Sequence, residues 1–236
     1  MENFVVGFAE LNVKILCVSP KIKFFCKDFL VENVEKVDFT ITSSLDNART
    51  LFEKGEGSLE YCEMLDVFRK IAELLPKFNR CVFHGASIKY KSSGIIFCAE
   101  SGVGKTTHIS LWKKNLKETE VINGDKPILW LKSDGVYACG NPWRGKEGFG
   151  GKTIQKVSAF CFLERNEKNS ILKIDDDEAL KLLLKQIYLP SQENAMQKTF
   201  DFLEELVKIP TYKLKCNMQN EAFTVAFNGL INKEIK

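Results

Sequence analysis

The chain has 236 residues, of which 44% are hydrophobic, so it can bury one substantial core. Its 34 basic and 31 acidic residues are well mixed and give a net charge of +3, which provides no electrostatic basis for binding nucleic acid or a membrane surface. The eight cysteines contain no Cys-x-x-Cys pair, and no apolar stretch approaches bilayer length. We therefore expect a soluble cytoplasmic protein with reduced, buried thiols.

Residues 1–58 are predicted to form a β-rich N-terminal region. Apolar residues alternate or cluster over 4–6, 13–16 and 37–41, between turn signals. No linker rich in Pro, Gly or Ser separates this region from residues 59–236. We expect it to be either a separate lobe or a lobe of the domain that the rest of the chain forms.

Residues 59–236 are predicted to form an α/β core. A helix over 59–75 has one apolar face, with Ser58 as its cap and Pro76 at its end. Further helices are expected over 177–189, 193–207 and 220–231. Strands are expected over 81–83, 88–90, 94–98, 120–122, 128–131, 136–139, 157–163 and 212–214. So many strands predict a mixed central β-sheet with flanking helices.

One motif indicates the chemistry. Residues 99–106, Ala-Glu-Ser-Gly-Val-Gly-Lys-Thr, fit the phosphate-binding (P-loop) pattern small-x-x-x-x-Gly-Lys-Thr and lie between a predicted strand and a predicted helix. Glycines let backbone N–H groups turn inward around an anion, the lysine reaches the outer phosphates, and the threonine hydroxyl ligates Mg²⁺. The alternative is a glycine-rich surface turn. The residues expected to bind the nucleotide are Ser101, Gly102, Val103, Gly104, Lys105, Thr106 and Thr107.

The strand over 120–122 is followed by Asn123-Gly124-Asp125. A phosphate-binding loop needs an acid to complete the Mg²⁺ shell, so Asp125 is predicted to bind the metal, directly or through water, together with Thr106. Asp125 is also the candidate base for the proton of an acceptor hydroxyl. The alternative is a simple turn between two strands.

Two other segments supply candidate catalytic residues. His84 precedes a glycine shortly before the strand of the phosphate loop, and it is either a structural hydrogen-bonding residue or part of the site. Residues 140–152 concentrate glycine and positive charge in a non-helical stretch. This composition indicates a mobile loop whose Arg144 and Lys146 neutralise a transferring phosphoryl group, or else a solvated basic turn.

These segments, in this order and spacing, resemble the HPr serine kinase family and its phosphoenolpyruvate carboxykinase-like relatives. The resemblance is carried by Phe83-His84-Gly85-Ala86, by residues 94–97 and by residues 100–106. Asn141-Pro142-Trp143-x-Gly145-Lys146 is similar to a segment of short, stand-alone serine-kinase-like homologues. The similarity covers residues 80–165 well and the later helices loosely.

The resemblance implies a phosphoenolpyruvate carboxykinase/HPr kinase-like fold that uses ATP and Mg²⁺. It implies that Lys105 and the backbone of residues 102–107 hold the phosphates, that Thr106 and Asp125 lie at Mg²⁺, and that His84 lies beside the acceptor. A homo-oligomer is also implied, because HPr kinases tend to form hexamers.

The chain departs from the family at one position. HPr kinases typically have two adjacent aspartates where this chain has Gly124-Asp125. Either Asp125 performs both roles or the base is lost, and Glu100 is then a substitute candidate.

The sequence therefore predicts an ATP- and Mg²⁺-dependent kinase that transfers the γ-phosphoryl group to a hydroxyl, with serine of a protein, a peptide or a small molecule as acceptor. The alternative is a regulatory protein that binds the nucleotide and does not turn it over. A GTPase or transport ATPase is disfavoured, because the sequence has no Asn-Lys-x-Asp and no Leu-Ser-Gly-Gly-Gln motif.

Overall fold

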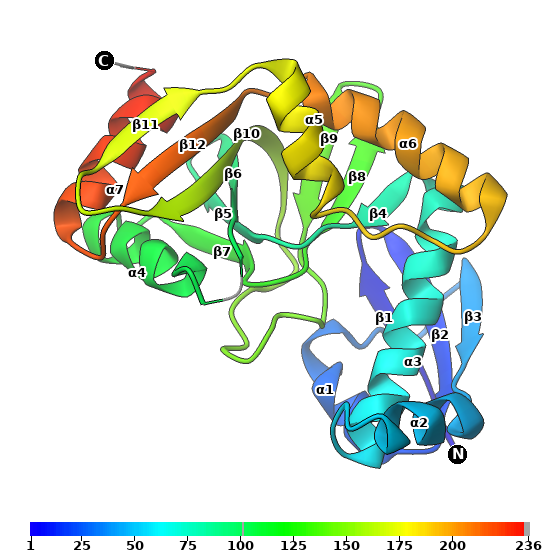
Figure 1. Ribbon diagram of the computed structural model, residues 1–236. Helices are drawn as coiled ribbons and strands as arrows, with labels where there is room; N and C mark the ends of the chain where they lie inside the picture. Colours follow the sequence, from blue (N-terminus) through cyan, green and yellow to red (C-terminus); the bar gives the residue numbers. More distant parts are fainter. Residues whose placement is uncertain (101, 234–236) are drawn as a thin grey trace.

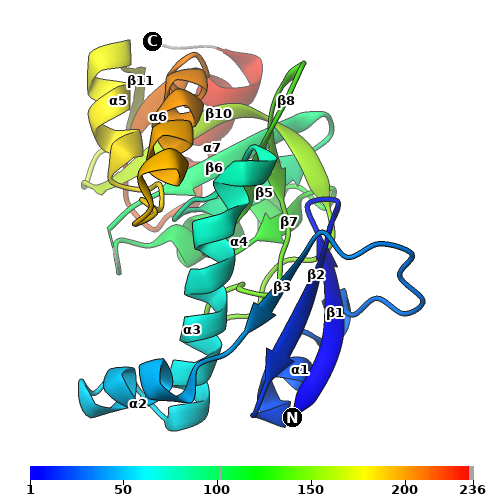
Figure 2. The ribbon, with the colours of Figure 1, turned by 90° about the vertical axis from the view of Figure 1, so that its right-hand side faces the viewer.

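Two β-sheets organise the computed structural model, which describes residues 1–100 and 102–233 (Figure 1). The first is a three-stranded sheet in the order β1-β2-β3, and the second has nine strands. Helix α3 runs along the small sheet and reaches the large one (Figure 2).

The small sheet belongs to the N-terminal part of the chain. Strand β2 pairs antiparallel with β1 and parallel with β3. Strict alternation of buried and partly exposed residues along β2 shows that one face of the sheet is covered, as the sequence pattern predicts. The elements of this part are β1 (Glu2–Phe8), β2 (Leu11–Cys17), α1 (Pro20–Phe25), η1 (Lys27–Phe29), β3 (Phe39–Thr42), α2 (Leu45–Glu53), α3 (Leu59–Leu74) and η2 (Leu75–Phe78).

Two buried carboxylates on α3 connect it to the small sheet. Glu63 accepts hydrogen bonds from the backbone N–H groups of Val18 (2.6 Å) and Ser19 (2.9 Å) at the end of β2. Asp66 accepts one from the N–H of Ser44 (2.8 Å) just after β3. These bonds satisfy buried charges, so the two acids have a structural role.

The large sheet is mixed, as the sequence predicts. Its order is β4-β8-β9-β10-β6-β5-β7, with β12 beside β10 and β11 beside β12. The long strand β10 pairs antiparallel with β9 at its start and parallel with both β6 and β12 further along. The strands are β4 (Arg80–Val82), β5 (Ala86–Tyr90), β6 (Ser93–Cys98), β7 (Glu120–Asn123), β8 (Ile128–Lys132), β9 (Gly135–Cys139), β10 (Ile154–Arg165), β11 (Ser170–Lys173) and β12 (Thr211–Cys216).

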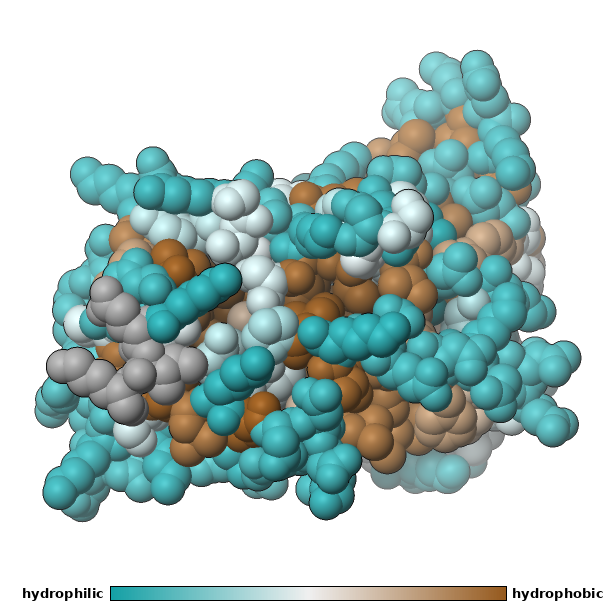
Figure 3. Space-filling model, turned by 90° about the horizontal axis from the view of Figure 1, so that it is seen from above, coloured by the Kyte–Doolittle hydropathy of each residue, from teal (hydrophilic) through white to brown (hydrophobic). Residues whose placement is uncertain are grey.

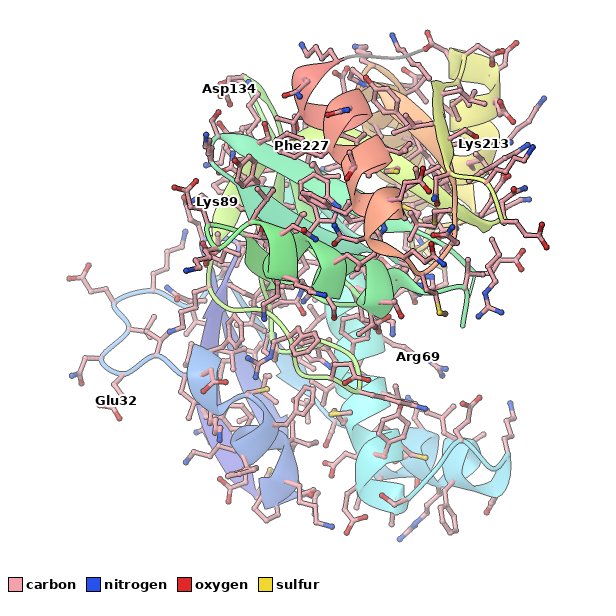
Figure 4. All side chains as sticks on the ribbon, turned by 90° about the vertical axis from the view of Figure 1, so that its left-hand side faces the viewer. Glu32, Arg69, Lys89, Asp134, Lys213 and Phe227 are labelled. Atoms are coloured by element: carbon pink, nitrogen blue, oxygen red, sulfur yellow. The ribbon has the colours of Figure 1, made fainter. Side chains whose placement is uncertain are left out.

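Helices cover both faces of the sheet around β6. Ile95 and Phe97 belong to the core under α4 (Lys105–Asn115) and α7 (Asn220–Phe227, continued by the π-helical η3, Asn228–Asn232). Ile96 and Cys98 face the other way, toward α5 (Asp176–Leu184) and α6 (Glu193–Val207). On the first face, the fully buried ring of Trp112 contacts Phe223 and Phe227, the latter labelled in Figure 4.

One predicted helix ends earlier than expected. The pattern over 177–189 predicts a continuous helix, but α5 ends at Leu184. The next residues return to the sheet: the N–H of His84 donates to the carbonyl of Gln186 (2.8 Å), and the N–H of Tyr188 donates to that of Val82 (2.9 Å). Strand-like bonds with β4 therefore replace the last helical turn. The short elements α1, α2 and β11 were not predicted.

The N-terminal part shares a hydrophobic core with the large sheet. One buried cluster joins Val67 and Ile71 of α3 and the inner residues of β1 and β2 to Ile128, Cys139 and Trp143. The division between residues 1–58 and 59–236 stays a prediction, and α3 contacts both parts.

Several large apolar side chains are exposed on the surface. Seen from above, one face has apolar side chains in its middle and hydrophilic ones around them (Figure 3). Leu180, Leu184 and Phe200 on α5 and α6 are among the exposed large apolar residues. Within the part of the chain that the structure describes, every helix is too short or too polar to cross a membrane.

The buried His108 makes stability depend on pH. Its Nε2 accepts a hydrogen bond from Trp112 Nε1 (3.1 Å), and burial lowers its pKa to about 4. The unfolded chain binds a proton at this residue below about pH 6.5, but the folded chain binds it only at much lower pH, so stability falls as pH decreases through this window. Protonation of His108 in the unfolded chain alone lowers the free energy of unfolding by up to about 3 kcal/mol at low pH.

We expect His108→Gln, which keeps an acceptor for Trp112, to flatten this dependence. Chemical unfolding of both proteins at pH 7 and pH 5 measures it. Equal losses of stability in the two proteins would contradict the assignment to His108.

Candidate functional site

Strand pairing brings three segments of the chain to one edge of the large sheet. Strand β5 runs antiparallel between β6 and β7, so the start of β5 lies beside the ends of the other two. The glycine loop, residues 99–104, follows β6, Asp125 follows β7, and His84 precedes β5. In open α/β sheets, ligands bind at the carboxyl ends of the strands.

The glycine loop has a backbone that only glycine adopts easily. Gly102 (φ +79°) and Gly104 (φ +122°) have positive φ, whereas Val103 between them is not among the positive-φ residues. The N–H of Val103 donates to the carbonyl of Glu100 (3.2 Å), which closes a tight turn before α4. Gly104 is the N-cap of α4 and supplies no side-chain cap, so the first N–H groups of this helix are available to a ligand.

Lys105 lies across the loop. Its Nζ donates a hydrogen bond to the carbonyl of Ala99 (2.8 Å), which is the first residue of the motif. Burial lowers the pKa of Lys105, and the nearby Asp125 opposes this effect. The ammonium group is therefore partly desolvated, and its charge is felt by the nearby Asp125.

Arg165, at the end of β10, holds the other side of the loop. Its guanidinium donates to the carbonyls of Gly102 and Val103, the latter at 3.4 Å. Because these carbonyls turn toward β10, the bonds help to define the conformation of the loop. No sequence pattern indicates Arg165, because its place beside the loop depends on the parallel pairing of β6 and β10.

Asp125 lies between two basic side chains. Its Oδ2 is 2.7 Å from Nζ of Lys126, and its Oδ1 is 3.6 Å from Nε2 of His84. The carbonyl of Asp125 also accepts a hydrogen bond from the N–H of Gly85 (2.9 Å), which joins the two segments. The structure thus places His84 and Lys126 beside Asp125, with Lys105 nearby; their roles in a site stay predictions.

The charges around Asp125 suit an anionic ligand. Burial lowers the pKa of His84, Lys105 lowers it further, and Asp125 partly opposes the change. These surroundings favour the neutral form of the His84 imidazole. Two lysines face one carboxylate, so the cluster has an excess of positive charge that a phosphate group can neutralise.

A buried asparagine shapes the turn that carries Asp125. Oδ1 of Asn123 accepts hydrogen bonds from the N–H groups of Asp125 (2.9 Å) and Lys126 (2.7 Å). Its Nδ2 donates to the carbonyls of Asn141 (3.4 Å) and Trp143 (3.3 Å). Residues 123–125 therefore form a turn, and this turn carries the candidate site residue Asp125. Asn123 also connects the turn to the loop over 140–152.

That loop lies beside the end of β7 in Figure 1, and its glycines at both ends are closely packed; its mobility stays a prediction. A Cβ on Gly140 or Gly150 would collide with backbone atoms, and one on Gly145 would lie 2.8 Å from Cβ of Asp125. Gly124 donates its N–H to the carbonyl of Phe149 (2.9 Å). These glycines allow close backbone packing against β7 and Asp125.

The two basic residues of this loop differ in their surroundings. Arg144 pairs with Asp28 of the N-terminal part (Nη2 to Oδ2, 2.8 Å) and donates to the carbonyl of Gly150 (3.0 Å). Lys146 is exposed. Trp143 is buried against Phe68, with ring centroids 4.6 Å apart. Arg144 therefore connects the loop to the N-terminal part, and catalytic roles for Arg144 and Lys146 stay predictions.

The remaining predicted ligands are oxygen donors. Thr106 and Glu100 are exposed, and Ser101 lies outside the described residues. Within residues 1–100 and 102–233, no group of three or more His, Cys, Asp or Glu side chains is placed to bind a metal. A carboxylate and a hydroxyl are hard donors of the type that Mg²⁺ binds together with substrate phosphates and water.

Comparisons with known proteins give limited information. No protein-family model and no curated protein matches the chain. Among solved structures, it is similar to the HPr(Ser) kinase/phosphatase from Coxiella burnetii, with a TM-score of 0.40 and 10% identity over 64% of this chain and 92% of that one. At these values the similarity carries no information about the activity of this chain.

The close packing of Gly145 can be tested with a matched pair of variants. Gly145 and Gly148 both have positive φ (+75° and +64°), but only at Gly145 would an added Cβ meet another residue, Asp125. Alanine at either position introduces backbone strain of about 1 kcal/mol or more. We expect Gly145→Ala to lower Tm more than Gly148→Ala does, because only the first variant adds a steric conflict with Asp125. Each additional 1 kcal/mol of destabilisation lowers Tm by about 2–4 °C in a chain of this size. Equal Tm values would contradict the packing described.

Proposed function

We propose that this chain is an ATP- and Mg²⁺-dependent kinase that transfers the γ-phosphoryl group to a hydroxyl of a protein, peptide or small molecule, with serine as the preferred acceptor. The observation that carries the proposal is the juxtaposition of a glycine loop with an uncapped helix start and the cluster of Lys105, Asp125 and His84. Phosphoryl transfer requires mainly positioning and neutralisation of charge, and these residues supply both.

The donor phosphates bind to the N–H groups of the glycine loop and of the first turn of α4 in this proposal. Lys105 exchanges its hydrogen bond with Ala99 for a stronger, charge-assisted one to the outer phosphates. Thr106 and Asp125 would hold Mg²⁺, which would supply positive charge to offset the charge of the transferring phosphoryl group.

The acceptor approaches from the side of Asp125. In this proposal Asp125 is the base for the hydroxyl proton, and the neutral His84 orients the acceptor. Lys126, which is paired with Asp125, is close enough to turn its ammonium group toward the transferring phosphoryl group. Lys146 is accessible for the same purpose, and Arg144 contributes only if its pair with Asp28 opens.

A nucleotide-binding regulator without catalysis is the second candidate. Two observations favour it: Gly124 stands where the HPr kinases have a further aspartate, and the single carboxylate of Asp125 is already paired with Lys126. Such a protein binds ATP and does not transfer phosphate.

Nucleotide binding is tested with Lys105→Ala. We expect affinity for Mg·ATP to fall about tenfold or more, because a hydrogen bond to a charged group contributes about 1.5–3 kcal/mol. Titration calorimetry measures the affinity, with Lys114→Ala, an exposed lysine on the same helix, as control. An unchanged affinity in Lys105→Ala would remove the phosphate loop from the proposal.

Catalysis is tested with Asp125→Asn. We expect ATP binding to persist and transfer to fall by about 10²–10⁴-fold, the usual contribution of a general base. The assay follows label from γ-labelled ATP into the polypeptides and metabolites of a cell extract, with the exposed Asp134→Asn as control. Binding by the wild type without any transfer would favour the regulator, and normal transfer by Asp125→Asn would exclude Asp125 as base.

A further inference from the structure

A cavity of about 500 Å³ adjoins the glycine loop at the ends of β10 and β12, whereas Asp125 follows β7, which lies on the other side of β6 in the sheet. Val103 and Gly104 of the loop form part of its wall, and Thr107, His108 and Leu111 of α4 continue it. Positions 104, 107, 108 and 111 lie on one face of a helix. The ends of the parallel strands β10 and β12 close the other side.

The position of Lys105 indicates in which direction a triphosphate would lie along the glycine loop. In a phosphate loop the lysine contacts the outer phosphates, and backbone N–H groups hold the inner ones. His84 and Asp125 lie at β5 and β7, on the side of β6 away from β10, so a γ-phosphate held by Lys105 points toward them in the proposed complex. The inner end then points to the opposite side, where the cavity begins at Gly104 and Thr107.

The chemistry of the cavity suits a flat, partly polar ring system with a sugar. Leu111, Leu163 and Met218 provide apolar walls, and the volume lies in the range of small-molecule sites, about 300–1,000 Å³. Arg165 and Glu167 lie in the polar part of the lining. The carboxylate of Glu167 offers acceptors, which ribose hydroxyls and exocyclic amines of bases require.

We infer that this cavity binds the nucleoside part, base and ribose, of the phosphoryl donor, and that Arg165 fixes the junction between the cavity and the glycine loop. The inference rests on the proposed function. It assigns the donor and the acceptor to opposite sides of the loop: the nucleoside lies at β10 and β12, and the acceptor lies at β5 and β7. It also identifies the donor as a nucleoside triphosphate, because a donor without a nucleoside would leave the cavity unused.

The test compares ATP with inorganic tripolyphosphate, each with Mg²⁺, by titration calorimetry on the full chain. Tripolyphosphate reaches only the loop, whereas ATP reaches both loop and cavity. We expect ATP to bind at least about tenfold more tightly to the wild type, because the base buries apolar surface. Leu111→Trp, which fills the cavity, should abolish this difference and change tripolyphosphate affinity less than about twofold.

Two further variants make the result specific. Ser110→Trp places the same side chain at an exposed position on α4 outside the cavity lining and should retain the difference. Met218→Ser changes an exposed wall residue that is 60% accessible, so it tests the cavity even if Leu111→Trp does not fold, and it should weaken ATP binding about threefold.

The outcomes separate this inference from the proposed function. Equal affinity of the wild type for the two ligands, or equal weakening of both by Leu111→Trp, would overturn the nucleoside assignment and leave the phosphate loop intact. If neither ligand binds the wild type, the proposed function fails, and the inference fails with it.

Discussion

The site depends on the way β5 pairs with both of its neighbours. Because β5 runs antiparallel between β6 and β7, the start of one strand and the ends of two others meet at one edge of the sheet. The glycine loop, His84 and Asp125 are therefore close in space, although Asp125 lies 21 positions after the last residue of the loop, Gly104. A hydrogen bond from the N–H of Gly85 to the carbonyl of Asp125 joins the segment before β5 to the segment after β7.

Close backbone contacts then determine how these segments are held. Glycines at positions 124, 140, 145 and 150 let the loop over 140–152 lie directly on β7 and the turn after it. Asn123 uses its whole amide to join this loop to the turn that carries Asp125. The same loop contacts the N-terminal part through Trp143, which packs on Phe68, and through Arg144, which pairs with Asp28. The loop therefore links the N-terminal part to the turn that carries Asp125.

Charge is distributed unevenly along this edge. The two positive charges of Lys105 and Lys126 outnumber the single negative charge of Asp125. Burial and the nearby Lys105 lower the pKa of His84, which favours its neutral form. On the other side of the loop, Arg165 bonds to carbonyl groups, and apolar residues of α4, β10 and β12 surround the cavity. The edge thus changes from a polar, positively charged half to a largely apolar half, with the glycine loop between them.

The sequence alone determined the glycine loop, the order of most strands and helices, and the candidates Lys105, Asp125 and His84, because glycine spacing and apolar periodicity are local properties. Only the tertiary structure decided the early end of α5, the pairing of Arg144 with Asp28 and the place of Arg165 beside the loop. The last two contacts join residues 116 and 63 positions apart, respectively. Such contacts depend on how sheets and loops pack, which no local pattern specifies.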